Sequence, residues 1–275
     1  MGVTPQETVV GQPAASACRV ATAYEGYAFS GLAPGIHQGL PSGSLTFIVS
    51  LAEEIDIQRM PGNDAPRSFQ AFVAGLHAFP ATIVHNGSGR GVSFNISPIT
   101  CRGVFGMPAA ELASRVVDVS DLLGHLGVEL VERLLDAPDW RRRFDVLDGA
   151  LARMETETSR PDMSLVAAWN LLLASRGTLT TSELAREVGY SRRHLTQRFV
   201  AEFGLAPKTV ARVLRFEHTR SLIENGCALA EAATRGGYYD QAHLTNEWRG
   251  LAGMTPAVWK AAELRDRQLG LAEVP

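Results

Sequence analysis

The sequence has few cysteines and almost no lysine. Its three cysteines, Cys18, Cys101 and Cys227, lie far apart in the 275 residues, and none belongs to a Cys-x-x-Cys pair. Because disulfide frameworks and zinc sites need paired thiols, we expect neither, and we expect no metal or other cofactor. Of the 26 basic residues only Lys208 and Lys260 are lysines. Arginine is the better bidentate ligand for guanine and phosphate, although a GC-rich genome produces the same bias.

Long apolar runs are also missing. Residues 45–51 form one of the longest runs and still contain Thr and Ser, whereas a membrane helix needs about 20 apolar residues. The first 17 residues lack a basic start followed by an apolar stretch, so we expect no signal peptide. The sequence therefore predicts a cytoplasmic protein with no membrane partner.

Negative charge prevails overall, with a net charge of −3, but it is unevenly distributed. Residues 160–275 hold 15 basic and 12 acidic residues, whereas residues 1–159 hold 11 and 17. The C-terminal part is therefore net positive, which leaves nucleic acid open as a partner. The chain length suits two domains.

Between residues 19 and 96, short stretches alternate apolar with polar residues and are separated by clusters of Gly, Pro and Asn. This alternation is typical of half-buried strands, and breakers such as Pro61-Gly62-Asn63-Asp64 suit the turns of a meander. We predict a flexible tail over residues 1–17 and a β-rich regulatory domain, a small β-barrel or sandwich, over 18–105. The expected strands are 20–29, 45–51, 68–74, 82–84 and 92–96.

From residue 106 the apolar spacing becomes helical. Helices are expected to begin at Pro108 and to cover 119–135 and 140–154. The second carries a leucine stripe, which suits either a helix packed on its own barrel or a dimer seam. We assign 106–155 to a helical extension that is a candidate for dimerisation, 156–161 to a linker, and 162–275 to an all-α DNA-binding domain. The predicted fold class is α+β with two domains.

The strongest signal is a duplication inside the C-terminal domain. The offset between the copies is 48 residues up to Gly189-Tyr190 and Gly237-Tyr238, and it becomes 49 after one inserted residue. Beyond the insertion, His194-Leu195-Thr196 matches His243-Leu244-Thr245. One supersecondary unit therefore occurs twice.

Each copy has the pattern of a helix-turn-helix unit. A short helix is followed by Gly189 or Gly237, since glycine readily takes the left-handed conformation that ends a helix. Ser191 or Asp240 then caps the next helix. Residues 207–224 are predicted to form a linker helix of about 25 Å, close to the ~34 Å between successive major-groove faces.

In the second helix of each copy, the face opposite the core carries side chains that read DNA. Arg, Gln and Asn form bidentate bonds to base edges, and Ala or Thr can contact a thymine methyl group. A merely solvated face is the alternative, which the caps and turn glycines disfavour. For His194 and His243 we expect packing rather than metal binding. The predicted DNA-binding residues are Ser191, Arg192, Arg193, Thr196, Gln197, Gln241, Ala242, Thr245, Asn246 and Arg249.

The C-terminal domain resembles the AraC/XylS family of transcription regulators. The resemblance is carried by Gly-Tyr-Ser-x-x-His-Leu-x-x-x-Phe at 189–199, Gly-Tyr-x-Asp-Gln-Ala-His-Leu at 237–244 and Ala-Gly-Met-Thr-Pro at 252–256. It implies two recognition helices in successive major grooves of double-stranded DNA. The second helix departs from the family pattern at Asn246 and Gly250, where basic residues are common, so it should bind phosphate more weakly.

The N-terminal region, from Tyr24 to Leu45, is similar to regulatory domains of the same family, which implies effector sensing, homodimerisation or both. RNA polymerase is a further expected partner of the chain. Tyr24, Tyr27 and His85 are possible polar anchors for a small-molecule effector. An interaction-only module without a ligand is an open alternative.

Enzymatic alternatives have little support, and we expect no enzyme. A cupin-like metal enzyme would need clustered ligands, but His37, His77 and His85 are scattered and no His-x-His is present. A repair-type methyl acceptor would need a reactive cysteine near histidine, which Cys18 and Cys101 lack.

Overall fold

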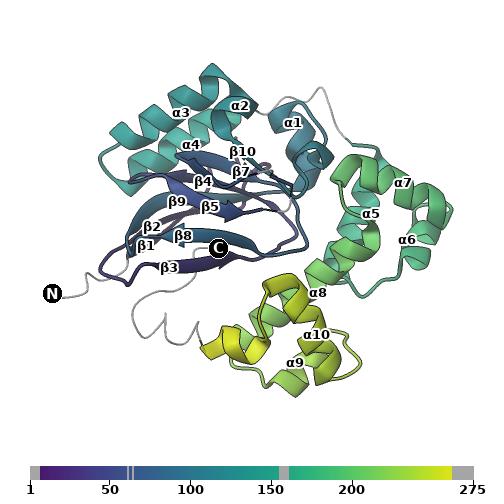
Figure 1. Cartoon of the computed structure of the whole chain (residues 1–275). Coiled ribbons are helices and arrows are strands. Elements are labelled where there is room, and N and C mark those ends of the chain that lie inside the picture. Colours follow the sequence, from purple (N-terminus) through teal and green to yellow (C-terminus); the bar gives the residue numbers. More distant parts are fainter. Residues whose placement is uncertain (1–6, 61, 64, 155–160, 262–275) are drawn as a thin grey trace.

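The computed structural model describes residues 7–60, 62–63, 65–154 and 161–261. It has two parts, a β-rich N-terminal domain partly covered by helices and an all-helical C-terminal domain (Figure 1). The predicted α+β class with two domains is confirmed. The linker predicted over 156–161 falls almost entirely outside the described residues.

Two antiparallel sheets make up the N-terminal domain. In the larger one the strands are ordered β1-β2-β9-β4-β7-β10, and in the smaller one β3-β8-β5-β6. Leu45, Phe47 and Val49 of β4 are almost fully buried at the centre of the larger sheet. The larger sheet comprises β1 (Glu7–Gly11), β2 (Tyr24–Phe29), β4 (Leu45–Ser50), β7 (Ala71–Ala74), β9 (Gly89–Ile96) and β10 (Val116–Asp118). The smaller comprises β3 (Gly35–Gly39), β5 (Ile55–Arg59), β6 (Arg67–Phe69) and β8 (Ala81–His85).

The structure corrects the predicted borders of the β-rich domain at both ends. Strand β1 lies inside the predicted tail, where it pairs with β2 as an edge strand. Strand β10 lies inside the predicted helical extension, where it pairs with β7. Both are short strands at the edges of the sheet. Strands of this length are too short to show a clear alternation of apolar and polar residues in the sequence.

Helices α1 (Cys101–Phe105), α2 (Val119–Leu123), α3 (His125–Asp136) and α4 (Trp140–Met154) follow the sheets, and α3 and α4 cover one face of the larger sheet (Figure 1). The single helix predicted over 119–135 is split, because Gly124 has φ 57° and begins α3 in a new direction. A short 3-10 helix, Ala109–Leu112, replaces the helix predicted from Pro108.

Apart from Leu126, the predicted leucine stripe packs on the core of the larger sheet. Leu130 and Leu134 are at most 1% exposed and lie in the same core cluster as the strands of the larger sheet. Leu126 and Leu135 are 43% and 44% exposed. Packing on the larger sheet therefore accounts for Leu130 and Leu134, whereas Leu126 and Leu135 stay exposed on opposite sides of α3.

The C-terminal domain consists of two helical units joined by α8 (Figure 1). The first unit contains α5 (Met163–Ala174), α6 (Thr181–Glu187) and α7 (Arg192–Phe203). The second contains α9 (Leu229–Arg235) and α10 (Gln241–Ala252), and the joining helix α8 spans Pro207–Glu224, as predicted. Each unit has its own apolar core.

The N-terminal domain contributes side chains to both of these cores. Leu76, in the loop after β7, is 1% exposed and belongs to the core of the first unit. Ala78 belongs to the core of the second unit, with Leu40 packed against it. Both units therefore rest on the same loop, 75–80, of the N-terminal domain.

Candidate nucleic-acid interface

The turn of the first unit is built as the sequence predicts. Gly189 has φ 71° between α6 and α7, a left-handed conformation that side chains other than glycine rarely adopt. The Ser191 hydroxyl accepts a hydrogen bond from the His194 amide at 3.2 Å and caps α7. A capping box formed by Thr180 and Glu183 begins α6.

The second unit repeats this geometry around Gly237, which has φ 73°. The Asp240 carboxylate accepts a hydrogen bond from the His243 amide at 2.7 Å and caps α10. The two histidines also occupy equivalent places. His194 meets the edge of Tyr190 at 4.6 Å between ring centroids, and His243 meets Tyr238 at 5.4 Å. Both rings therefore pack on the tyrosine of their own turn.

The inner faces of α7 and α10 hold the units together. Six side chains at three- and four-residue spacing are all 0% exposed. They are Leu195, Phe199 and Phe203 in α7 and Leu244, Trp248 and Leu251 in α10. Their burial fixes the rotation of each helix, so the opposite face must point outward.

On the outer face of α7, Arg192, Arg193 and Gln197 are exposed. Among the described residues, neither Arg192 nor Arg193 has an ion-pair partner, whereas Arg198 binds Asp162 at 2.9 Å. The Thr196 hydroxyl donates to the Arg192 carbonyl oxygen at 2.9 Å. The Thr196 methyl group and the lone pairs of its hydroxyl oxygen are therefore the groups left for contact with a base.

On the outer face of α10, Gln241, Ala242, Asn246 and Arg249 are exposed. The Thr245 hydroxyl donates to the Gln241 carbonyl oxygen at 2.8 Å, as Thr196 does in α7. Arg249 donates to the Asn246 side-chain oxygen at 3.4 Å, which leaves the Asn246 amide hydrogens as its free polar atoms. All the predicted residues except the capping Ser191 thus lie in α7 or α10.

Sequence reasoning missed two residues near these helices. Tyr239, in the turn before α10, is 94% exposed. Glu202, near the end of α7, forms a two-pronged ion pair with Arg102 of the N-terminal domain, with an N–O distance of 2.8 Å. The one-residue insertion in the second copy of the repeat was a sequence signal that could have drawn attention to Tyr239. No sequence pattern indicated that Arg102 pairs with Glu202, 100 positions away.

Comparison with known proteins agrees with this geometry. Residues 184–262 match a family model described as a helix-turn-helix domain. YbfI of Bacillus subtilis (strain 168), an uncharacterized HTH-type transcriptional regulator, is 30% identical over 66 residues, which are 24% of this chain and 24% of YbfI. The match thus spans about a quarter of that relative. The C-terminal part is an AraC-type helix-turn-helix domain.

Solved structures resemble the chain beyond its AraC-type domain. A ToxT structure from Vibrio cholerae is 10% identical, covers 94% of this chain and 98% of ToxT, and has a TM-score of 0.50. Wild-type ToxT with a bound unsaturated fatty acid is 8% identical, covers 94% and 95%, and has a TM-score of 0.54. At such identities the likeness shows a shared fold alone, a β-rich domain followed by the AraC-type domain.

The three candidate effector anchors do not surround one space. Tyr24 points toward the helices, where its ring stacks on Phe144 of α4 and its hydroxyl donates to Asp148 at 2.8 Å. Burial and this acceptor raise the pKa of Tyr24. Tyr27 lies on the other face of β2 and stacks on Phe29, which in turn meets the edge of His85.

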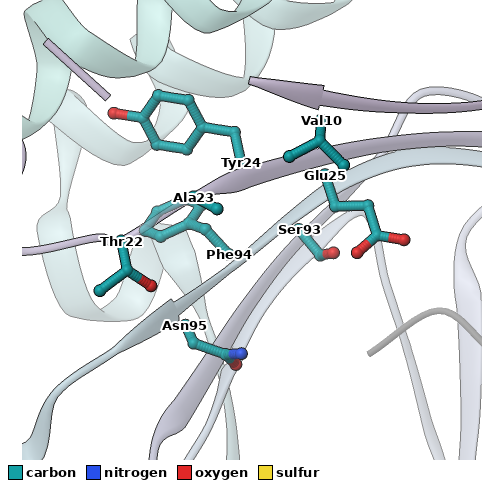
Figure 2. Close-up of a pocket in the computed structure, with 8 residues that line it drawn as sticks. All are labelled: Val10, Thr22, Ala23, Tyr24, Glu25, Ser93, Phe94 and Asn95. Atoms are coloured by element: carbon teal, nitrogen blue, oxygen red, sulfur yellow. The ribbon is translucent and has the colours of Figure 1, made fainter. Parts of the chain in front are cut away.

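A cavity of about 80 Å³ lies beside Tyr24 and is bordered by β1, β2 and β9. Figure 2 shows its lining side chains, among them the carboxylate of Glu25 and the hydroxyl of Ser93. A water molecule takes up about 30 Å³ in the liquid, so this cavity has room for water rather than for a metabolite.

A second cavity, of about 250 Å³, lies between the smaller sheet and the AraC-type domain. Gln38, Arg59 and Thr82 contribute polar atoms from the strands and their ends. Its apolar wall comprises Phe79, Pro80, Ala252 and Met254, with Gly253 between the last two. The cavity thus touches the end of α10 and combines a cation with apolar surface.

The three histidines weighed for a metal site do not form one cluster. His77 is buried and bonds to the Phe79 carbonyl oxygen, while His37 and His85 lie on the neighbouring strands β3 and β8. Burial and the nearby His85 lower the pKa of His37 to about 4, so it is neutral at physiological pH. In the described ranges no group of three or more His, Cys, Asp or Glu side chains is arranged to hold a metal ion. None of the described helices is long and apolar enough to cross a membrane.

Proposed function

We propose that the chain is a sequence-specific transcription regulator that inserts α7 and α10 into successive major grooves of double-stranded DNA. The observation that carries this proposal is the repeated turn, cap and core, which leaves Arg192, Arg193 and Gln197 on one exposed face. Side chains of this kind form bidentate bonds to guanine and adenine edges.

The linker helix supports binding of both units to one duplex. Helix α8 has 18 residues, which corresponds to about 27 Å at 1.5 Å per residue. Nine of its residues are buried among the two units, so α8 serves as a rigid spacer. Successive major-groove faces are ~34 Å apart, and the side chains of the two units supply the remaining reach.

Selection of duplexes from a random library with the full chain tests the proposal. We expect the recovered sequences to share two half-sites whose centres lie about 10 base pairs apart. The affinity for this duplex should exceed that for unrelated DNA by at least about a thousandfold at physiological salt. Recovery of no common sequence would contradict it.

For the N-terminal domain we propose effector sensing at the cavity between the domains. Arg59 supplies a cation, and Phe79, Pro80 and Met254 supply apolar surface, which together suit a small amphipathic carboxylate. ToxT structures carry an unsaturated fatty acid and a methylnaphthalenyl butenoic acid, which share this chemistry. Because the cavity touches α10, its occupancy would change how the second unit is held.

The effector proposal is tested by thermal shift of the full chain with a monounsaturated fatty acid. The melting temperature of the wild type should rise, because a ligand that binds only the folded state stabilises it. Arg59→Ala should abolish the rise. Arg67→Ala, which removes an exposed arginine of the same sheet that pairs with Asp121, should preserve it. A wild type that fails to respond would favour the interaction-only module.

A homodimer and RNA polymerase are the other partners that we propose. Helix α3 exposes Leu126 on one side of its buried face and Val128 and Leu135 on the other, each more than 40% exposed, and these apolar side chains offer contacts to a second copy. Sedimentation of wild type and Leu126→Glu tests the dimer, with loss of the dimer expected in the variant. Contact with RNA polymerase would follow from binding beside a promoter.

A further inference from the structure

The single residue that breaks the internal repeat lies in the turn before the second recognition helix. In the first unit one residue, Tyr190, separates Gly189 from the capping Ser191. In the second unit two residues, Tyr238 and Tyr239, separate Gly237 from the capping Asp240. The insertion therefore adds an aromatic residue at the amino end of α10.

The two tyrosines have opposite environments. Tyr238 is 5% exposed in the core of the second unit, with the Arg215 guanidinium 5.6 Å from its ring centroid. Tyr239 is 94% exposed, so its ring contacts almost nothing in the protein. A large aromatic side chain held in water gains no packing energy, so the folded chain alone does not account for it.

The backbone nevertheless holds Tyr239 in a defined place. The Tyr238 amide donates to the Ala233 carbonyl oxygen at 2.9 Å, and the Tyr239 amide donates to Nδ1 of His243 at 3.4 Å. Asp240 follows in an extended conformation and caps α10. The turn is therefore fixed on both sides of Tyr239, which presents the side chain beside the first turn of the recognition helix.

The charge of the second unit makes an uncharged contact useful. Over the aligned ranges, residues 181–203 hold four basic and three acidic residues, whereas residues 229–252 hold two basic and three acidic residues. Arg235 is paired with Glu231 within its own helix. A net negative unit repels phosphate, and a hydroxyl group can donate a hydrogen bond to phosphate without adding charge.

We propose that Tyr239 contacts the DNA backbone beside the second half-site, its hydroxyl donating to a phosphate oxygen and its ring lying against the sugar. The inference rests on the proposed function, since it needs α10 in the major groove. Phosphate contacts position a protein without reading sequence. Tyr239 therefore supplies affinity and register to the second unit, and Gln241, Ala242 and Asn246 supply its sequence preference.

Binding of the full chain to its selected duplex, measured by fluorescence anisotropy across salt concentrations, tests the proposal. Tyr239→Phe should weaken binding about threefold to tenfold, the usual effect of one lost hydrogen bond. Tyr239→Ala should weaken it further. Neither should change the slope of log affinity against log salt, because no charge is removed, whereas loss of an arginine that contacts phosphate, tested by Arg192→Ala, should reduce the slope by about 1. The selected sequence should be the same for wild type and both tyrosine variants.

A methylphosphonate duplex sharpens the test. Each phosphate beside the second half-site is replaced in turn by a neutral methylphosphonate. At one of these positions the replacement should lower the affinity of the wild type and leave the affinity of Tyr239→Phe unchanged. Tyrosine variants that bind within twofold of wild type would overturn the proposal, as would a loss confined to transcription with RNA polymerase. If wild type selects no sequence and Arg193→Ala has no effect, the proposed function itself fails.

Discussion

At the scale of single residues, the arginines of the AraC-type domain separate into two groups. Arg198 and Arg212 are held by Asp162 and Glu247 at 2.9 and 2.6 Å, so their charge is neutralised within the protein. Arg192 and Arg193 have no such partner among the described residues and lie at the first turn of α7. Arginines of the second group therefore keep their full charge and free hydrogen-bond donors for DNA.

We expect Arg193→Ala to lower affinity for the selected duplex by about ten- to a hundredfold, the range for one bidentate base contact. Asn246→Ala should lower it by about threefold or less, because the Asn246 oxygen is already engaged by Arg249. Parallel titrations of both variants give the comparison. Equal losses would contradict the ranking of the two units, and circular dichroism checks that both variants fold.

The outer faces of α7 and α10 were predictable from the sequence because helical spacing fixes which side chains are buried. The hydrogen bonds made by those side chains were not predictable. Thr196 and Thr245 each donate to the carbonyl oxygen four residues earlier. Their hydroxyl hydrogens are therefore used within the helix, and the methyl groups and oxygen lone pairs are left for contact with a base. For Tyr239, the only sequence signal was the one-residue insertion in the second copy of the repeat.

At the scale of helices and turns, glycines set the junctions. Gly189, Gly204 and Gly237 all have φ between 71° and 79° and end or separate helices. A Cβ at Gly189 would meet no atom within 4 Å, so only its backbone conformation requires glycine. A Cβ at Gly204 would lie 2.2 Å from Cβ of Ala113, so this glycine also allows the domains to approach.

Alanine substitutions should separate the cost of the left-handed backbone from the cost of the steric contact between the domains. Gly189→Ala should destabilise the chain by about 1–2 kcal/mol through its left-handed backbone alone. Gly204→Ala should cost more, because the contact with Ala113 is added to the same strain. Gly149→Ala is the matched control: it lies within α4 with open space around it and should stabilise by about 0.5–1 kcal/mol. Urea unfolding measures all three, and a Gly189→Ala loss equal to that of Gly204→Ala would contradict this account.

Strands were predicted less completely than helices. The centre of the larger sheet was recognised because β4 and β9 are long and apolar, but β3 and β5 were missed. Strand β3, Gly-Ile-His-Gln-Gly, has glycine at both ends and one strongly apolar side chain, Ile36, which is 65% exposed. Its place is set by pairing with β8 rather than by its own pattern, and such tertiary pairing overrides local propensity.

At the scale of the whole molecule, the N-terminal domain contacts both units of the AraC-type domain. Arg102 binds Glu202 of α7, and the Gly43 amide donates to the Glu217 carboxylate of α8 at 3.2 Å. Burial raises the pKa of Glu217, and the Gly43 amide partly opposes that shift. Leu76 adds an apolar contact in the first core. These contacts join residues about 100 or more positions apart, so no local sequence pattern could reveal them.

The Arg102–Glu202 pair should couple the domains during unfolding. The Glu202 side chain is 8% exposed and that of Arg102 is 30% exposed, so Arg102→Ala leaves a nearly buried carboxylate without its cation, at a cost of about 1–3 kcal/mol. We expect calorimetry to show one transition for wild type and an earlier, separate transition of the AraC-type domain in Arg102→Ala. Arg153→Ala removes the exposed pair with Glu129 inside the N-terminal domain and should change stability by less than about 0.5 kcal/mol. A single unshifted transition in Arg102→Ala would mean that the apolar contacts of Leu76 and Ala78 hold the domains together without the ion pair.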